Sequence, residues 1–313
     1  MPVTTPARRV TVDAASDGQR LDNFLLRETA LPRTRVYRLI RKGEVRVDGG
    51  RCKPMQKLRA GNEVRIPPLR RDEPDERAGS PPQDMLDRLQ SCVVLTRPGL
   101  RIINKPSGWA SQPGSDIRWS LVELVRAAWG PQWQPAHRLD RATSGCMAIV
   151  EGRPAHIAFA AGDWRKQYLA VVHGVGPAQE ALWEDALMRR ASGQVEVTTA
   201  DEPGAKLARL QVRTRQQTGP FSWLEITLDT GRMHQIRVQC AARGLPLIGD
   251  ERYGDRARDR TSFGPRRPRL ALHALSLTGE WQGEPVIAQA EPDADFQALQ
   301  LAMGGALSGQ IEQ

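Results

Sequence analysis

The sequence predicts an α+β protein that consists of a small basic module and a larger body. Stretches of strand character outnumber helical ones in the body and do not alternate regularly with them, which argues against a doubly wound parallel sheet. The 313 residues are enough for two domains, and 40% hydrophobic and 26% charged residues are ordinary for a globular protein. We therefore expect two folded parts.

Positive charge is concentrated in the N-terminal part. The chain has a formal net charge of +9, and residues 18–71 hold fifteen Lys and Arg against five Asp and Glu, so the rest of the chain is nearly neutral. A merely solvated surface is the simpler explanation, but so local an excess is better explained by binding to phosphate groups. The side chains expected to make these contacts are Arg38, Arg41, Lys42 and Arg46.

Periodicity within this module predicts two helices and a small sheet. Apolar residues at 21–25 have helical spacing, and a second helix over 35–42 has an apolar face opposite its basic residues. The alternation at 45–47 predicts a strand, and Asp48-Gly49-Gly50 is a strong hairpin signal. Residues 1–17 lack a core pattern, so we expect them to be flexible or to form an edge strand.

Composition sets the limits of the parts. Residues 72–84 are rich in proline and charge, which predicts a flexible linker, and we take the linker as residues 72–90. The body then spans residues 91–300, and residues 301–313 are a C-terminal tail. Strand character is found at 95–104, 166–175, 207–213 and 223–228, and helical character at 121–129 and 155–164.

The body is centred on the nine residues from His137 to Gly145, HRLDRATSG. The apolar run 146–150 that follows predicts a buried strand, so the polar cluster lies in the loop that enters this strand. Asp140 is its only carboxylate, and the flanking Arg138 and Arg141 favour its ionised form, which suits a nucleophile. On spacing alone, a structural aspartate that caps a turn or pairs with arginine is the more common case.

Metal, cofactor and membrane signals are missing from the sequence. The four cysteines form no C-x-x-C pair, and there is neither a G-x-G-x-x-G motif nor a P-loop. No apolar run approaches the length of a membrane span, and the N-terminus lacks the apolar region of a signal peptide. We therefore expect no metal, no cofactor and no membrane contact, and a reducing, cytoplasmic setting.

Six motifs, in the same order, resemble those of the RluA family of RNA pseudouridine synthases. The central one matches the family pattern HRLD-x-x-TSG. One motif would be weak evidence, but six at sensible spacings are strong. In this sequence they are Ile103–Gly108, His137–Gly145, Lys166–Ala170, Thr230–Arg237, Gly249-Asp250 with Tyr253-Gly254, and Leu272–Ala274.

This resemblance implies a fold and a reaction. It implies a body with a mixed, largely antiparallel sheet and a central cleft, and the basic module resembles an S4 RNA-binding domain. The combination is most similar to the RluC type, which modifies large-subunit ribosomal RNA. The implied reaction is the isomerisation of uridine to pseudouridine, without cofactor or metal, by a protein that we expect to be a monomer bound to ribosomal RNA.

The resemblance also implies roles for four residues. Asp140 corresponds to the catalytic carboxylate, and Arg237 to the arginine paired with it. Arg138 corresponds to the residue that fills the gap left by the flipped base, although a structural ion pair fits it equally well. Tyr168 corresponds to the aromatic residue beneath the uracil, although a tyrosine in a strand is more often core.

Some positions depart from the family pattern, and two other functions stay open. Ala142, Ser111-Gln112 and Glu151-Gly152 differ from the usual residues, which leaves the substrate less certain than the reaction. The alternatives are a non-catalytic S4-type RNA-binding protein and a glycosidase, although a glycosidase normally needs a second carboxylate. The basic, proline-containing loop at 255–269 either adds RNA contacts or is a solvated insertion.

Overall fold

The computed structural model describes residues 4–302 except 30, 32, 71–79, 115 and 116. The chain divides into two compact units, Met1–Ser80 and Pro81–Gln313. No helix in the described residues is long and apolar enough to cross a membrane.

The N-terminal unit packs two helices on a small sheet. The strand order is β2-β4-β3, and apolar residues of both helices and of the sheet share one core. Burying one face of each helix leaves the basic residues of α2 at the surface, as the sequence pattern predicts. The elements are β1 (Thr4–Thr5), β2 (Arg8–Thr11), the short 3₁₀ helix η1 (Ala14–Ser16), α1 (Leu21–Thr29), α2 (Arg33–Lys42), β3 (Arg46–Val47), β4 (Glu63–Ile66) and β5 (Leu69–Arg70).

The hairpin turn predicted at 48–50 is present. Val47 and Gly50 exchange both backbone hydrogen bonds, at 3.2 and 2.9 Å. The two residues between them, Asp48 and Gly49, have φ of 49° and 76°, as a type I′ turn requires.

Of the two alternatives for the N-terminal segment, the edge strand is present within residues 4–17, because β2 pairs with β4 at the edge of the sheet and Val12 is only 2% exposed. The prediction for the linker needs correction. The linker does not extend to residue 90, because α3 (Gln83–Ser91) is a helix whose Leu89 is fully buried in the core of the second unit. Residues 72–79 of the predicted linker lie outside the described residues.

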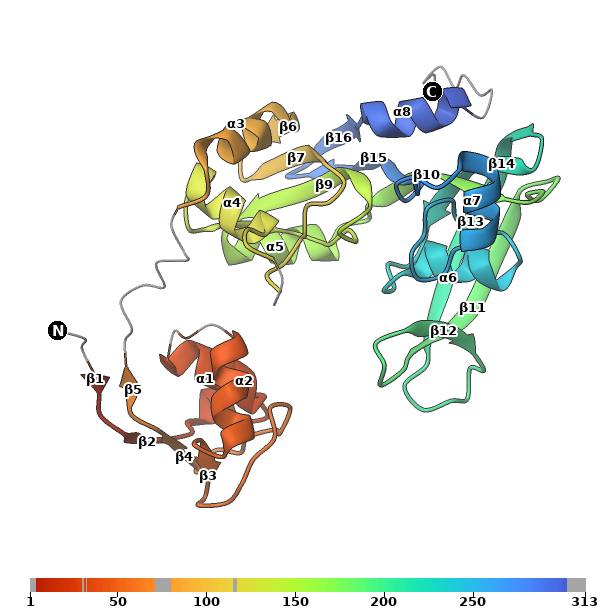
Figure 1. Ribbon diagram of the computed structural model, residues 1–313. Coiled ribbons are helices and arrows are strands. Elements are labelled where there is room, and N and C mark those ends of the chain that lie inside the picture. The colour runs from red at the N-terminus through yellow and green to blue at the C-terminus, as the bar shows by residue number, and fades with distance from the viewer. Residues whose placement is uncertain (1–3, 30, 32, 71–79, 115–116, 303–313) are drawn as a thin grey trace. The chain divides into compact units, whose positions relative to one another are not determined.

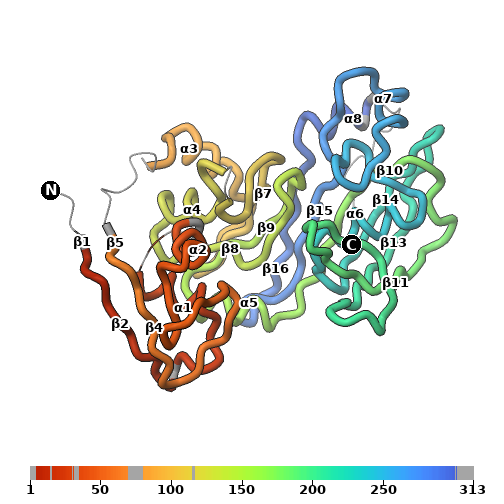
Figure 2. The backbone as a smooth tube through the Cα atoms, turned by 60° about the horizontal axis from the view of Figure 1, so that its bottom comes forward, coloured from red at the N-terminus to blue at the C-terminus, as the bar shows by residue number. Residues whose placement is uncertain are grey.

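The second unit is built on an 11-stranded sheet, with the order β12-β11-β13-β14-β10-β15-β9-β7-β6 and with β16 and β8 paired to β15 and β9. Figure 2 shows these strands side by side from β7 across to β11. The strands are β6 (Val93–Arg97), β7 (Leu100–Lys105), β8 (Trp133–Pro135), β9 (Ser144–Glu151), β10 (Arg165–His173), β11 (Ala181–Arg189), β12 (Val195–Thr198), β13 (Lys206–Thr218), β14 (Phe221–Leu228), β15 (Leu272–Trp281) and β16 (Glu284–Gln289).

Helices accompany both halves of this sheet. Figure 1 shows α3, α4 and α5 beside the half that contains β7 and β9, and α6 and α7 beside the half that contains β13 and β14. The fold is therefore α+β, as the sequence predicts. The remaining helices are α4 (Leu121–Trp129), α5 (Gly152–Ala161), α6 (Gln235–Ala242), α7 (Arg256–Phe263) and α8 (Ala294–Ala302).

The sheet is mixed and largely antiparallel, with one parallel pair in the described residues. That pair joins β9 to β15 through the partners Ser144–His273 and Gly145–Ala274. Gly145 has φ of 110°, and a Cβ there would lie 2.1 Å from the carbonyl oxygen of Ala274. Only glycine fits this close approach, and the last two residues of the central motif, Ser144 and Gly145, are thus the first two residues of β9.

The basic segment at 255–269 is not a loop throughout. Its first half is the helix α7, and the Asp255 side chain caps it by accepting hydrogen bonds from the backbone N–H groups of Ala257 and Arg258, both at 3.0 Å. The buried Asp259 fixes the helix to β10 through His173, at 2.8 Å. Of the predicted C-terminal tail, residues 301–302 belong to α8 and residues 303–313 lie outside the described residues.

Candidate active site

The central motif forms the loop between β8 and β9, and the Ile103–Gly108 motif supports it through hydrogen bonds. Gly108 donates its backbone N–H to the carbonyl of Arg141 at 2.8 Å, and Ser107 donates its hydroxyl to the carbonyl of Ala142 at 2.8 Å. The buried Ser111, one of the departures from the family pattern, donates to the carbonyl of Leu139 at 2.6 Å. These contacts fix the backbone on both sides of Asp140.

Lys105 completes this support from a fully buried position. Its Nζ donates to the carbonyls of Pro106 and Trp109 at 2.8 and 2.9 Å, and more weakly to that of Arg141 at 3.3 Å. Burial lowers the pKa of Lys105 to about 7.

Asp140 is bound by Arg237, which comes from α6. The Nη1 of Arg237 donates to Oδ2 of Asp140 at 2.8 Å, and the two side chains are 10% and 18% exposed. The structure therefore brings together the pair that the sequence resemblance predicts.

The same arginine holds a second carboxylate, which sequence reasoning missed. Arg237 makes a bidentate contact with Asp250, with both N–O distances at 2.7 Å, and the Asp250 side chain is 0% exposed. Burial alone would raise the pKa of Asp250, but Arg237 and the backbone N–H groups of Arg252 and Tyr253 hold it below its ordinary value. Burial also acts to lower the pKa of Arg237, but its two carboxylates raise it above its ordinary value.

Asp140 lines a small cavity of about 120 Å³. This volume suits one planar ring better than a larger cofactor, since pockets for drug-sized ligands hold roughly 300–1,000 Å³. The cavity contains three of the residues singled out from the sequence beside Asp140, namely Arg138, Tyr168 and Arg237. Ile236, Leu228 and Leu272 add apolar wall.

Tyr168 and Arg138 occupy different positions in this cavity. Tyr168 on β10 is 7% exposed, so it is a core residue and a cavity residue at once. Burial, with a smaller contribution from Asp140, raises the pKa of Tyr168 above its ordinary value, so the phenol is neutral. Arg138 is exposed, and its side chain has no ion pair or hydrogen bond with any described residue, so the structure does not support the alternative of a structural ion pair.

Two histidines of the motifs, His137 and His273, form hydrogen bonds with the surrounding residues and do not line the cavity with Asp140. His137 accepts the backbone N–H of Ala148 at its Nε2 atom, 3.0 Å away, and burial lowers its pKa to about 3. His273 lies between the hydroxyl of Ser144 and the carbonyl of Ala290, both at 2.8 Å, and burial lowers its pKa to about 4. Both rings are therefore neutral parts of the scaffold.

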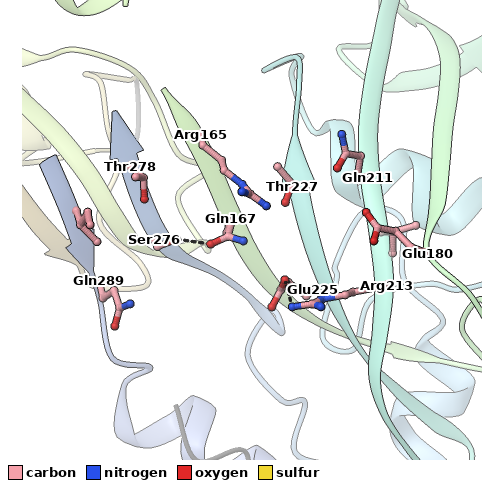
Figure 3. Close-up of a pocket in the computed structure, with 12 residues that line it drawn as sticks. Arg165, Gln167, Glu180, Gln211, Arg213, Glu225, Thr227, Ser276, Thr278 and Gln289 are labelled. Atoms are coloured by element: carbon pink, nitrogen blue, oxygen red, sulfur yellow. Dashed lines mark hydrogen bonds and ion pairs between the residues drawn. The ribbon is translucent and has the colours of Figure 1, made fainter. Parts of the chain in front are cut away.

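A larger groove of about 810 Å³ lies elsewhere in the second unit, across strands β10, β13, β14, β15 and β16 (Figure 3). Gln167 lines this groove, whereas the next residue, Tyr168, lines the cavity with Asp140, as expected for neighbours that point to opposite faces of a strand. The buried Glu225 in it is paired with Arg213 and Arg215. The groove therefore offers polar side chains but no chemistry like that around Asp140.

In the N-terminal unit, the four predicted RNA contacts are accessible. Arg38, Arg41 and Lys42 are exposed on α2, and Arg46 is half-buried on β3. None of the four has an ion pair with a described residue, whereas Arg9, Arg20 and Arg27 do. The described residues of the chain hold no group of three or more His, Cys, Asp or Glu side chains that could bind a metal ion.

Comparison with known proteins agrees with this geometry. Residues 99–242 match the family described as RNA pseudouridylate synthase, and residues 19–64 match the S4 domain. Ribosomal large subunit pseudouridine synthase C of Salmonella typhimurium is 35% identical over 94% of this chain and 96% of its own length, and its namesake in Haemophilus influenzae is 32% identical over 95% of both chains.

The chain belongs to the RNA pseudouridylate synthase family. It is therefore an RNA pseudouridine synthase with an N-terminal S4 domain. Among solved structures, Human RNA Pseudouridylate Synthase Domain Containing 4 superimposes with a TM-score of 0.59 at 18% identity, over 71% of this chain and 96% of that one. Human RNA Pseudouridylate Synthase Domain Containing 1 gives 0.54 at 23% identity, over 67% and 86%. These two structures share the fold.

The three site residues that sequence reasoning missed all lie within motifs of this synthase family. Asp250, His234 and Tyr253 all lie within the motifs Thr230–Arg237 and Gly249–Gly254, and each contacts Arg237, Asp140 or one another. Motif order alone could have marked them as neighbours of the site. Their contacts depend on the folding of α6 against the segment before α7, which no local pattern reveals.

Proposed function

We propose that this protein isomerises specific uridines of large-subunit ribosomal RNA to pseudouridine, with Asp140 as the catalytic carboxylate. The reaction breaks the N1–C1′ bond of uridine and joins the same base through C5. A carboxylate near C1′ can attack the sugar, stabilise positive charge as the bond breaks, or take a proton from the sugar. The observation that carries the proposal is that Asp140, bound to Arg237, lines a cavity of one-ring size beside Tyr168.

The other residues divide the remaining tasks. Arg237 neutralises and orients Asp140, since a charge-assisted hydrogen bond fixes the carboxylate plane. Tyr168 supports the uracil, and Arg138, exposed and unpaired among the described residues, stacks in the space that the base leaves. Flipping the base costs a few kcal/mol, which such stacking partly offsets.

The ribosomal target rests on two supports. Relatives that match along nearly the whole chain are named large-subunit pseudouridine synthases, and the S4 unit presents Arg38, Arg41, Lys42 and Arg46 without carboxylate partners among the described residues. Phosphate contacts of this kind provide affinity without sequence preference. A monomer that acts on ribosomal RNA in the cytoplasm is part of the same proposal.

The two alternative functions fit less well. A glycosidase needs a second carboxylate near the first, but Asp250 is fully buried and bound to Nε and Nη2 of Arg237, so it cannot reach a substrate. A non-catalytic RNA-binding protein would not require the buried Arg237 beside Asp140.

Tritium release from RNA labelled at C5 of uridine tests the reaction, because C5 loses its hydrogen when it bonds to C1′ and N1 gains one. We expect Asp140→Asn to abolish release while RNA affinity stays nearly intact, since the amide keeps the shape of the side chain without its charge. Asp163→Asn at an exposed position is the matched control. Release within about tenfold of the wild type would exclude Asp140 as the catalytic group, because a transition-state role is worth more than that.

Carbodiimide treatment and reverse transcription of ribosomal RNA test the target. RNA from a deletion strain should lack specific pseudouridines in the large subunit, and the wild-type gene but not Asp140→Asn should restore them. Unchanged large-subunit RNA would refute the ribosomal target and leave the reaction to be sought on another RNA.

A further inference from the structure

His234 belongs to the Thr230–Arg237 motif, and the reaction described above gives it no task. It directly precedes α6 and lines the cavity that holds Asp140. Its backbone is left-handed, with φ of 54°. The other two described non-glycine residues with positive φ, Asp48 and Gln282, lie in hairpin turns, whereas His234 is the third residue of the turn 232–235 that leads into α6, closed by a hydrogen bond from the Gln235 backbone N–H to the Arg232 carbonyl at 3.2 Å. Such strained positions concentrate at functional sites.

A chain of hydrogen bonds determines which ring nitrogen of His234 carries the proton. The backbone N–H of Val195 donates to the hydroxyl oxygen of Tyr253 at 3.0 Å. The same hydroxyl lies 2.9 Å from Nδ1 of His234, and its proton has no other acceptor among the described residues. The hydroxyl therefore donates to Nδ1, and the neutral ring carries its proton on Nε2.

The protonated nitrogen faces the catalytic carboxylate. His234 Nε2 lies 3.8 Å from Oδ1 of Asp140, while Oδ2 of the same carboxylate accepts the hydrogen bond from Arg237. At 3.8 Å the Nε2–H attracts Oδ1 without a full hydrogen bond, and catalytic hydrogen bonds often shorten only when substrate is bound. The two oxygens of Asp140 therefore face two different N–H groups, and Oδ2 alone accepts a hydrogen bond from one of them in this structure.

The surroundings keep the imidazole neutral. Burial lowers the pKa of His234, and the positive charges of Arg237 and Arg252 act in the same direction, whereas the negative charges of Asp140 and Asp250 oppose it. Tyr253, the other polar group against the ring, packs edge-on at 5.5 Å. A neutral imidazole can orient the carboxylate of Asp140 through its Nε2–H group. Unlike a protonated imidazole, it does not transfer a proton to that carboxylate.

We infer that His234 is a second positioning residue for Asp140, held in its Nε2–H tautomer by Tyr253. This inference rests on the proposed function, because it assigns the task of fixing Oδ1 of the catalytic carboxylate. Arg237 holds Oδ2 of Asp140 through a charge-assisted hydrogen bond, and the Nε2–H group of His234 points toward Oδ1. The pair leaves Asp140 a single orientation toward the sugar of the bound uridine.

Two amide substitutions in the full-length protein test this assignment. The side-chain nitrogen of Gln in H234Q reaches the place of Nε2, whereas that of Asn in H234N reaches only the place of Nδ1. We expect H234N to lower the single-turnover rate by about tenfold or more, with the RNA dissociation constant within about twofold of the wild type. H234Q should recover most of the lost rate, and the matched control H156N on α5 should behave as the wild type.

The outcomes separate this inference from the proposed function. Equal losses for H234Q and H234N, or losses that parallel a drop in melting temperature, would mean that His234 only packs in the wall. A fully active H234N together with an inactive Asp140→Asn would overturn the inference alone. Activity of Asp140→Asn would overturn the proposed function itself. Y253F, which removes the hydroxyl that fixes the tautomer, should lower the rate in the same direction as H234N.

Discussion

At the scale of single residues, Arg237 has two tasks that substitution can separate. It orients the partly exposed Asp140, and it neutralises Asp250, which is completely buried. Loss of an arginine that balances a buried carboxylate leaves an uncompensated charge, which costs about 3–5 kcal/mol. Lower activity after a change at Arg237 therefore has two possible origins, and stability measured against pH distinguishes them.

We expect Arg237→Met to change how stability depends on pH. In the wild type, the lowered pKa of Asp250 contributes stability above its ordinary value near 3.8, which is lost as pH falls through the folded-state value. In the variant, only the backbone N–H groups of Arg252 and Tyr253 still oppose the effect of burial, and we expect burial to place the folded-state pKa of Asp250 above that of the unfolded chain. Stability is then present at low pH and lost as pH rises. Urea unfolding from pH 4 to 7 should show the gap to the wild type widen to about 3–5 kcal/mol.

The double variant Arg237→Met with Asp250→Asn is the control for this prediction. Without a carboxylate at position 250, the gap should no longer grow with pH. A gap of constant size in the single variant would show that Arg237 stabilises the fold through packing and not through Asp250.

The structure has the residue contacts that motif positions predicted, while the roles of these residues stay predictions. Arg237 binds Asp140, and Tyr168 and Arg138 line the same cavity. The contact between Asp250 and Arg237 was not predicted. The motifs assign Arg237 one carboxylate partner, and only the folded chain shows that it binds two. The contact between His234 and Tyr253 was not predicted either, because the two residues belong to different motifs that only the folded chain brings together.

At the scale of elements, the parallel pair of β9 and β15 joins the two halves of the sheet and begins immediately after the loop that contains Asp140. Gly145 makes this pairing possible, because a Cβ there would lie 2.1 Å from the Ala274 carbonyl oxygen and 2.6 Å from its nitrogen. Backbone atoms on both strands cannot yield without breaking the pair, so a side chain here disturbs the sheet and the loop together.

Gly145→Ala should therefore destabilise the protein much more than its backbone angle alone predicts. Gly130→Ala is the matched control, since Gly130 has φ of 113°, close to the 110° of Gly145, but nothing lies within 4 Å of its added Cβ. We expect the control to cost about 1–3 kcal/mol from strain. Gly145→Ala should cost at least about 2 kcal/mol more, in the range of the most severe single substitutions. Equal costs in thermal unfolding would show that β15 can move away from β9.

Element predictions from sequence failed where a helix contains few apolar residues. The proline-rich composition before α3 masked its start, although Leu89 is fully buried. In α7 the buried anchor is Asp259, whose partner His173 is 86 residues away. No periodic apolar pattern signals such a helix, because its stability comes from a cap and the buried hydrogen bond between Asp259 and His173.

At the scale of the whole molecule, charge and chemistry are divided between the two units. Residues 18–71 carry the positive excess of the chain, while the cavity with Asp140 lies wholly within Pro81–Gln313. Each unit has its own core, so removal of one leaves the other its buried residues. The division predicts that affinity for RNA and the rate of the chemical step can be changed separately.

Deletion of residues 1–80 tests this division and leaves α3, which begins at Gln83, intact. We expect the remaining unit to fold and to keep its single-turnover rate at saturating RNA, but to bind large-subunit RNA more weakly. The slope of log K against log salt should fall by about 0.7–0.9 for each phosphate group that the protein no longer binds. In the full-length chain, simultaneous change of Arg38, Arg41 and Lys42 to Gln should produce part of the same fall, because these three are exposed and unpaired among the described residues. An unchanged slope in both proteins would mean that the S4 unit does not touch the RNA, whereas loss of the single-turnover rate in the deletion alone would mean that this unit helps to complete the active site.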